Sequence, residues 1–110
     1  MAETSLVYLH VNIQLVRGKE HVYTEAMTRF AQLLEGEYGW RLIGGFQSGI
    51  GRLGHVVHVW RVPSADAIAA TLTAVRQSQP AIREWSAAFA ESIESETLEV
   101  VHPTSYSPTP

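Results

Sequence analysis

The chain contains no cysteine, and this absence excludes disulfide bonds, thiolate metal ligands and thiol nucleophiles. It also has no run of lysine or arginine, and its net charge of −3 gives no electrostatic basis for binding nucleic acid or an anionic membrane. No stretch approaches the ~18 consecutive apolar residues of a membrane span, and residues 1–12 lack the basic segment of a signal peptide. We therefore expect a cytoplasmic protein that binds neither nucleic acid nor membrane.

The chain has 110 residues, of which 45% are hydrophobic and 17% are charged, a balance typical of one compact soluble domain. Its last residues are rich in proline and show no periodicity. We expect a domain over residues 1–103 and a flexible tail over residues 104–110.

The segment Ser5–Leu15 alternates between apolar and polar residues, which predicts a half-buried β-strand. Its apolar face comprises Val7, Leu9, Val11, Ile13 and Leu15, and its polar face comprises Tyr8, His10, Asn12 and Gln14. The rest of the chain shows six further elements. They are a helix ending near Gly36, strands over Trp40–Gln47 and His55–Val62, a helix capped by Ser64, a helix starting at Pro80, and a short strand over Glu96–His102.

This order, β-α-β-β-α(α)-β, is typical of the ferredoxin-like α+β fold with a four-stranded antiparallel sheet. In that topology the first strand is central, lies antiparallel beside the third, and turns its apolar residues toward the helices. Tyr8, His10 and Asn12 then lie on the open face, which is rarely left to water when it is large and carries aromatic side chains. We expect a second copy to cover it, giving a homodimer with a semi-polar cavity between the sheets.

The segment GHVVHVWRV contains two histidines, His55 and His58, that lie three residues apart. In a strand such residues point to opposite sides, so the two cannot bind one metal ion. Strand periodicity instead pairs His58 with Trp60 on one face and His55 with Arg61 on the other.

Sequence alone does not decide which of these faces is open, because a one-residue slip in register reverses the assignment. We favour the arrangement in which His58 and Trp60 lie on the open face beside His10. In that arrangement the indole lines the cavity, and Arg61 pairs with an acidic helix residue at the rim.

These residues form the main candidate catalytic site. His58 or His10 would act as general base, while Tyr8 and Asn12 would orient a carbonyl or an enolate. Trp60 would stack on an aromatic substrate. An alternative is that the same residues only form hydrogen bonds across a dimer interface.

Further candidate ligand contacts come from the third helix and from a loop. Trp85 and Phe89 share a helical face and fit either the core or the roof of the cavity. The stretch GIGRLG, residues 49–54, matches G-x-G-x-x-G, but a strand rather than a helix follows it. We interpret it as a hairpin loop in which Arg52 gates the cavity, contacts an acidic ligand, or is simply solvated.

The chain resembles the NIPSNAP family of the dimeric α/β-barrel superfamily. The resemblance rests on HVWRV (residues 58–62), on LVYLHVNIQLVRGKEHVYTEAM (residues 6–27) and on QPAIREWSAAF (residues 79–89). Val62 replaces an aromatic residue of the family pattern, and HVNIQ replaces its E-x-R. The resemblance implies two ferredoxin-like subunits whose sheets form a barrel with ligand cavities. It also implies relatives that include cofactor-independent monooxygenases, polyketide cyclases, dehydratases and haem-handling proteins.

We therefore expect a small homodimeric enzyme that needs no cofactor and binds an aromatic or polyketide-like compound. Its reaction would be acid–base chemistry such as cyclisation, or cofactor-free oxygenation. One alternative is a non-catalytic protein that binds a small hydrophobic molecule or haem, with His58 or His10 as the axial ligand. Another is a structural dimerisation module whose cavity is filled with side chains. Neither strand offers the convergent carboxylates of a non-haem metal site.

Overall fold

The computed structural model describes residues 7–108 and confirms the predicted order of elements. The elements are β1 (Val7–Leu15), α1 (Glu20–Glu37), β2 (Arg41–Gln47), β3 (His55–Val62), α2 (Ala65–Ser78), α3 (Ile82–Ser92) and β4 (Ile93–Val101). The expected strand residues Ser5 and Leu6, the N-terminal stretch 1–6 and the tail residues 109–110 lie outside this description.

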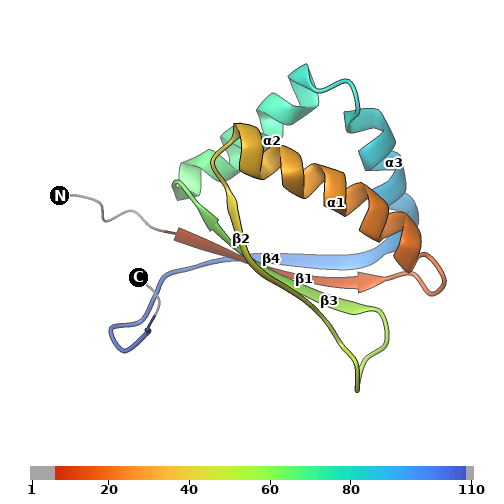
Figure 1. The fold of residues 1–110 in the computed structure, drawn as a ribbon, viewed down its shortest axis with the longest axis horizontal. Helices are drawn as coiled ribbons and strands as arrows, with labels where there is room; N and C mark the ends of the chain where they lie inside the picture. The colour runs from red at the N-terminus through yellow and green to blue at the C-terminus, as the bar shows by residue number, and fades with distance from the viewer. Residues whose placement is uncertain (1–6, 109–110) are drawn as a thin grey trace.

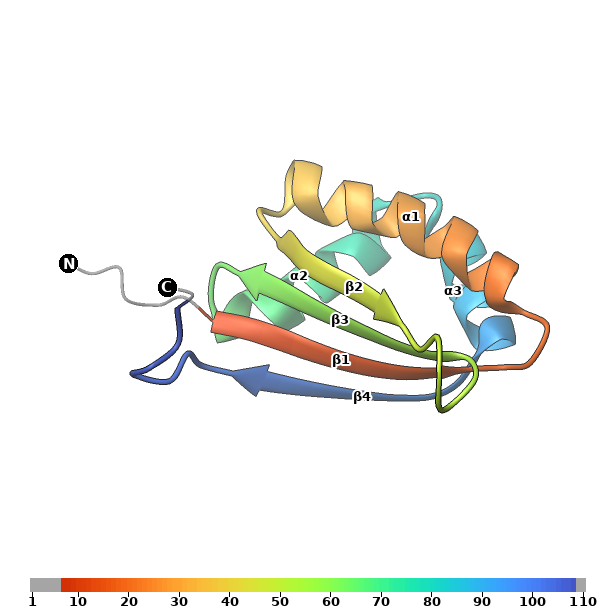
Figure 2. The ribbon, with the colours of Figure 1, turned by 60° about the horizontal axis from the view of Figure 1, so that its bottom comes forward.

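The four strands form one antiparallel sheet in the order β2-β3-β1-β4, so β1 is central and lies beside β3, as predicted. Within residues 7–108 all three helices lie on one face of the sheet, and the other face carries no helix (Figures 1 and 2). This is the ferredoxin-like α+β fold. No helix among the described residues is long and apolar enough to cross a membrane.

A local sequence signal accounts for the start of α2. The Ser64 side chain accepts a hydrogen bond from the Ala67 amide at 3.1 Å and caps α2. Pro80 lies in the turn before α3 rather than at its first position, because the helix begins at Ile82. β4 begins at Ile93, directly after this helix, and is longer than predicted.

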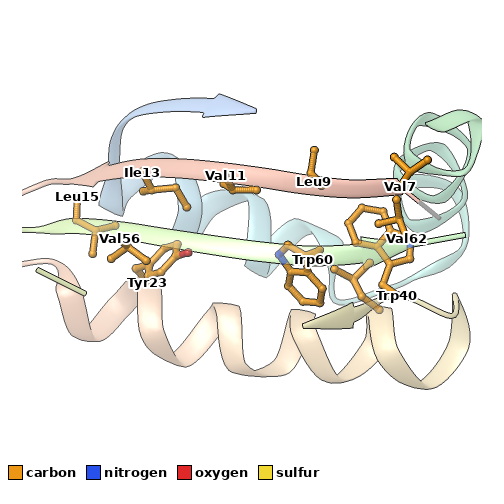
Figure 3. Packing of buried hydrophobic residues seen from close by; sticks show 11 residues of the cluster. Val7, Leu9, Val11, Ile13, Leu15, Tyr23, Trp40, Val56, Trp60 and Val62 are labelled. Carbon is orange, nitrogen blue, oxygen red and sulfur yellow. The ribbon is translucent and has the colours of Figure 1, made fainter. Parts of the chain in front are cut away.

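The main core lies between β1, β3 and the helices. The five apolar residues of β1 are buried and face the helices, as their alternation predicts. Trp60 of β3 meets Trp40 edge-on at a centroid distance of 5.7 Å. The Trp40 indole donates a hydrogen bond to the Thr71 hydroxyl of α2 at 3.2 Å. Figure 3 shows Trp60 and Tyr23 pointing into this layer from the sheet and from α1, respectively.

The strand register corrects the expected face of β3. Leu9 pairs with Trp60 and Val11 pairs with His58, so both β3 side chains point toward the helices. His10 pairs with Val59, on the open face. The prediction that His58 and Trp60 share a face with His10 is therefore wrong. The physical reason is the packing of Trp60, which is only 2% exposed beneath the helices.

Two further expectations change with the register. Arg61 pairs with Tyr8 and lies on the open face, away from the helices, so the expected contact with an acidic helix residue at the rim is wrong. The expected site is also divided, because Tyr8, His10 and Asn12 lie on one side of the sheet and His58 lies on the other. The sheet separates these groups.

Candidate functional site

A cavity of about 260 Å³ lies between the sheet and the helices, and we call it the inner cavity. Most of its lining is apolar and includes Leu9, Val11, Ile13, Phe30, Trp60 and Phe89. Trp60 and Phe89 both line this cavity, which lies between the sheet and the helices and not between two sheets as expected. The polar groups at its wall belong to His58, Tyr23 and Glu96.

His58 is the buried histidine of this cavity, with 7% of its surface exposed. Strand alternation aims it at α1, where Tyr23 occupies the first turns. The Tyr23 hydroxyl and Nε2 of His58 are 3.3 Å apart and hydrogen-bonded, and the two rings lie 6.2 Å apart with an interplanar angle of 27°. Trp60 meets His58 edge-on at 6.3 Å. The pair is thus fixed by two different elements.

The surroundings of the pair keep both partners neutral. Burial lowers the pKa of His58 below its ordinary value, so the imidazole is unprotonated at neutral pH. Burial, assisted by the negative charge of Glu96, raises the pKa of Tyr23, so its hydroxyl keeps its proton. In this state the imidazole can accept a proton, and the Tyr23 hydroxyl can donate a hydrogen bond.

Glu96 of β4 pairs with Ile13 and so shares the helix side of the sheet with His58. Burial raises the pKa of its carboxyl group. Its neighbour along this side, Leu98, is 57% exposed. Because both residues line the inner cavity, we place the opening of this cavity at the β4 edge of the sheet.

The open face carries a separate polar network. The Asn12 side chain lies between two histidines, with Oδ1 3.0 Å from Nε2 of His55 and Nδ2 3.3 Å from Nδ1 of His10. The hydroxyl of Ser48 lies 3.4 Å from Nδ1 of His55. Thus the structure brings His10 and Asn12 together as predicted, but their histidine partner is His55 and not His58. Tyr8 is buried on the same side of the sheet.

Of the other two predicted ligand contacts, Trp85 lies in the core and Arg52 lies in a loop. Trp85 packs in a second cluster with Ala26 and Val75, apart from the inner cavity. Arg52 lies exposed in the β2–β3 loop, and β3 follows this loop directly, so GIGRLG is a hairpin loop. Among residues 7–108 no group of three metal-binding side chains converges.

Sequence analysis missed Tyr23 and Glu96. Tyr23, Ala26, Phe30 and Leu34 follow one another at helical spacing, so the buried stripe of α1 could have been extended to the tyrosine. Glu96 gave no such signal, because it lies in an acidic segment that suggested a solvated surface.

Residues 12–108 match the NIPSNAP family. A NIPSNAP family protein of unknown function from Agrobacterium tumefaciens has a similar structure, with a TM-score of 0.79, 21% identity, and coverage of 97% of this chain and 96% of that chain. A NIPSNAP-like domain protein from Burkholderia xenovorans is also similar, with a TM-score of 0.75, 20% identity, and coverage of 96% of this chain and 91% of that chain.

The fold is also shared beyond that family. SnoaB, a cofactor-independent oxygenase from Streptomyces nogalater, superposes with a TM-score of 0.69 at 11% identity, covering 96% of this chain and 99% of that chain. Among curated proteins no sequence relative was found. The family match extends over most of the chain and agrees with the observed fold. The chain therefore belongs to the NIPSNAP family.

Proposed function

We propose that the protein is an enzyme that moves a proton on an aromatic or polyketide-like small molecule held in the inner cavity. The observation that carries this proposal is the hydrogen-bonded pair of His58 and Tyr23 at the wall of an otherwise apolar cavity. Catalytic groups with shifted pKa values in a concave apolar site are the usual signature of acid–base chemistry.

In the proposed mechanism the ligand separates the hydrogen-bonded pair: its carbonyl oxygen accepts the hydrogen bond of the Tyr23 hydroxyl in place of Nε2 of His58, and the carbon beside the carbonyl approaches the freed Nε2. The neutral imidazole removes a proton from this carbon, and the C–H electron pair forms an enolate. The Tyr23 hydroxyl donates a hydrogen bond to the enolate oxygen, where the negative charge develops. Trp60 and Phe89 supply the apolar wall for the ring of the ligand.

Two reactions continue from this intermediate. In a cyclisation, the enolate carbon forms a bond to a second carbonyl carbon, and His58 returns its proton to the oxygen of that carbonyl. In an oxygenation, molecular oxygen is the oxidant: a CH2 carbon of the ligand loses both hydrogens and becomes a carbonyl that contains one oxygen atom, and the other oxygen atom leaves with these hydrogens as water. The oxygenation is supported by the fold that the chain shares with SnoaB, a cofactor-independent oxygenase.

The size of the cavity favours a ligand smaller than haem. Its volume of about 260 Å³ lies just below the ~300–1,000 Å³ of pockets that hold drug-sized molecules. A haem bound through His58 would require the packing around the cavity to change.

A second copy of the chain is the partner we propose for the open face. Apolar side chains extend across this face from β2 to β4 and comprise Phe46, Val57, Val59 and Val101, of which Phe46 is 63% exposed. The Gln14 side-chain oxygen on this face is buried without a hydrogen-bond partner among the described residues. We assign Tyr8, His10 and Asn12 to this interface. Tyr8 is already buried in the single chain, and a second copy would cover the exposed apolar side chains around it.

Deuterium exchange at the methyl group of acetophenone tests the catalytic proposal. In deuterium oxide at neutral pH, the protein should accelerate this exchange by roughly a hundredfold or more, and His58→Gln should reduce the rate to near the background. His55→Gln removes a histidine from the opposite side of the sheet and should leave the rate unchanged. Binding of acetophenone without acceleration would instead identify a non-catalytic binding protein.

A further inference from the structure

A second hollow of about 250 Å³ lies between α1 and the β2–β3 hairpin, and we call it the outer groove. Its lining is more polar than that of the inner cavity and includes Glu20, Thr24, Thr28 and Gln47. Thr24, Thr28 and Gln47 are exposed, so the groove opens at the β2 edge of the sheet. The inner cavity opens at the opposite edge, near β4.

Three residues line both hollows: Tyr23, Met27 and His58. The candidate base and its hydroxyl partner therefore lie at the boundary between an apolar chamber and a more polar one. Neither hollow alone reaches the ~300–1,000 Å³ of pockets that take drug-sized ligands, but the two together fall within that range.

Gly45 keeps the outer groove open beside His58. It pairs with His58 in the sheet, and a β-carbon at this position would lie 3.5 Å from Cδ2 of the imidazole. The backbone does not require glycine here, because Gly45 is absent from the glycines with positive φ. The neighbouring Gly44 differs, since a β-carbon there would lie 2.7 Å from the ring of Phe46. A glycine inside a strand often marks a bulge, a bend, or the close approach of a ligand or another backbone. The register of β2 shifts between Leu42 and Gly44 and not at Gly45, which leaves close approach as the interpretation for Gly45.

We propose that the substrate is an elongated aryl ketone that spans both hollows, and that Gly45 determines which chain lengths are accepted. The ring occupies the inner cavity, the carbonyl lies at His58 and Tyr23, and the chain attached to the carbonyl extends past Gly45 into the outer groove. This inference rests on the proposed function, since it uses the same base and the same inner cavity.

Binding of two ketones to the intact protein, measured by calorimetry, tests the inference. Acetophenone carries only a methyl group on its carbonyl, whereas hexanophenone carries four additional methylenes. Each buried methylene contributes roughly a fourfold gain in affinity at most. We expect hexanophenone to bind at least about tenfold more tightly than acetophenone, because part of the chain stays near solvent.

Gly45→Val should remove this advantage and leave the affinity for acetophenone unchanged. Ala31→Leu, which fills the same groove from α1, should act in the same direction and covers the case in which the β2 variant folds poorly. Gly49→Val is the matched control, since a β-carbon at Gly49 meets nothing within 4 Å. Leu72→Phe, in the inner cavity, should weaken the binding of both ketones.

The outcomes separate the two proposals. If acetophenone binds and exchanges but hexanophenone gains no affinity, or keeps its gain in both groove variants, the elongated substrate is refuted and the catalytic pair stands. If neither ketone binds, the proposed function fails, and the inference that rests on it fails as well.

Discussion

The hydroxyl of Tyr23 lies 3.3 Å from Nε2 of His58, which joins the start of α1 to the middle of β3 across the cavity wall. Both groups are buried, and burial shifts their pKa values in opposite directions, downward for the imidazole and upward for the phenol. A neutral acceptor and a neutral donor therefore face each other at neutral pH. This relationship connects the fold to the proposed chemistry.

Tyr23→Phe tests the direction of this hydrogen bond. If the hydroxyl donates to the unprotonated Nε2, its removal should raise the pKa of His58 and lower the free energy of unfolding by about 1 kcal/mol. An NMR titration of the imidazole protons measures the first effect, and urea denaturation measures the second. Tyr38→Phe, a half-buried tyrosine of the core, is the control. A lower pKa in Tyr23→Phe would show that Nε2 is the donor.

The stability of the protein should depend on pH through His58. Its folded-state pKa lies below the ordinary value of 6.5, so the unfolded chain takes up a proton first as the pH falls. Stability is then highest above pH 6.5 and declines as the pH falls from there toward the lowered pKa. His58→Gln should flatten this decline in urea denaturation curves. An unchanged slope would argue against a buried neutral imidazole.

Glu96 should act in the opposite sense. Its folded-state pKa lies above the ordinary value of 4.5, so its contribution to stability is fully present below pH 4.5 and is lost as the pH rises through the raised pKa. Glu96→Gln should therefore stabilise the protein at neutral pH relative to the wild type, and this difference should shrink in acid. A variant that is less stable than the wild type at pH 7 would point to a carboxylate that is held by a favourable contact.

Thr71→Val should destabilise the fold by about 1–3 kcal/mol, because it leaves the buried indole N–H of Trp40 without its acceptor. Thermal unfolding followed by tryptophan fluorescence measures the effect. Thr73→Val changes an exposed threonine of the same helix and should alter stability by no more than about 0.5 kcal/mol. Equal effects of both substitutions would assign the loss to helix propensity rather than to the hydrogen bond.

Val59→Lys tests the proposed dimer. Val59 lies at the centre of the open face, and a charged side chain there should prevent a second copy from packing on it. Light scattering coupled to size-exclusion chromatography should give the mass of a dimer for the wild type and of a monomer for the variant. Ala69→Lys, on the exposed surface of α2, should remain a dimer. A wild-type protein that is monomeric at micromolar concentration would refute the assignment.

The sequence predicts the elements and their order because the periodicities are clear. The alternation in β1 is strictly apolar and polar, so the buried face of this strand follows from hydrophobicity alone. β3 differs, since one side carries Val56, His58 and Trp60 and the other carries Val57 and Val59. With valines on both sides, hydrophobicity does not decide which side meets the helices.

Because of this ambiguity, His58 and Trp60 are expected on the open face, whereas the structure places them on the helix side of the sheet. Alternation fixes which side chains of one strand share a face, and the register confirms the predicted groups within β3. The contact of His58 with Tyr23 depends on how α1 packs over β3, and local periodicity carries no information about this packing. Local periodicity also gives no information about the role of Gly45, because that role depends on the imidazole of His58 on the neighbouring strand.

The most direct test of the central claim is a crystal structure of the wild-type protein with acetophenone bound. We predict that the ring lies in the inner cavity against Trp60, with the ketone oxygen within hydrogen-bond distance of the Tyr23 hydroxyl and the methyl carbon beside His58. A ketone bound instead on the open face, beside His10 and Asn12, would contradict the assignment of the site to the helix side of the sheet.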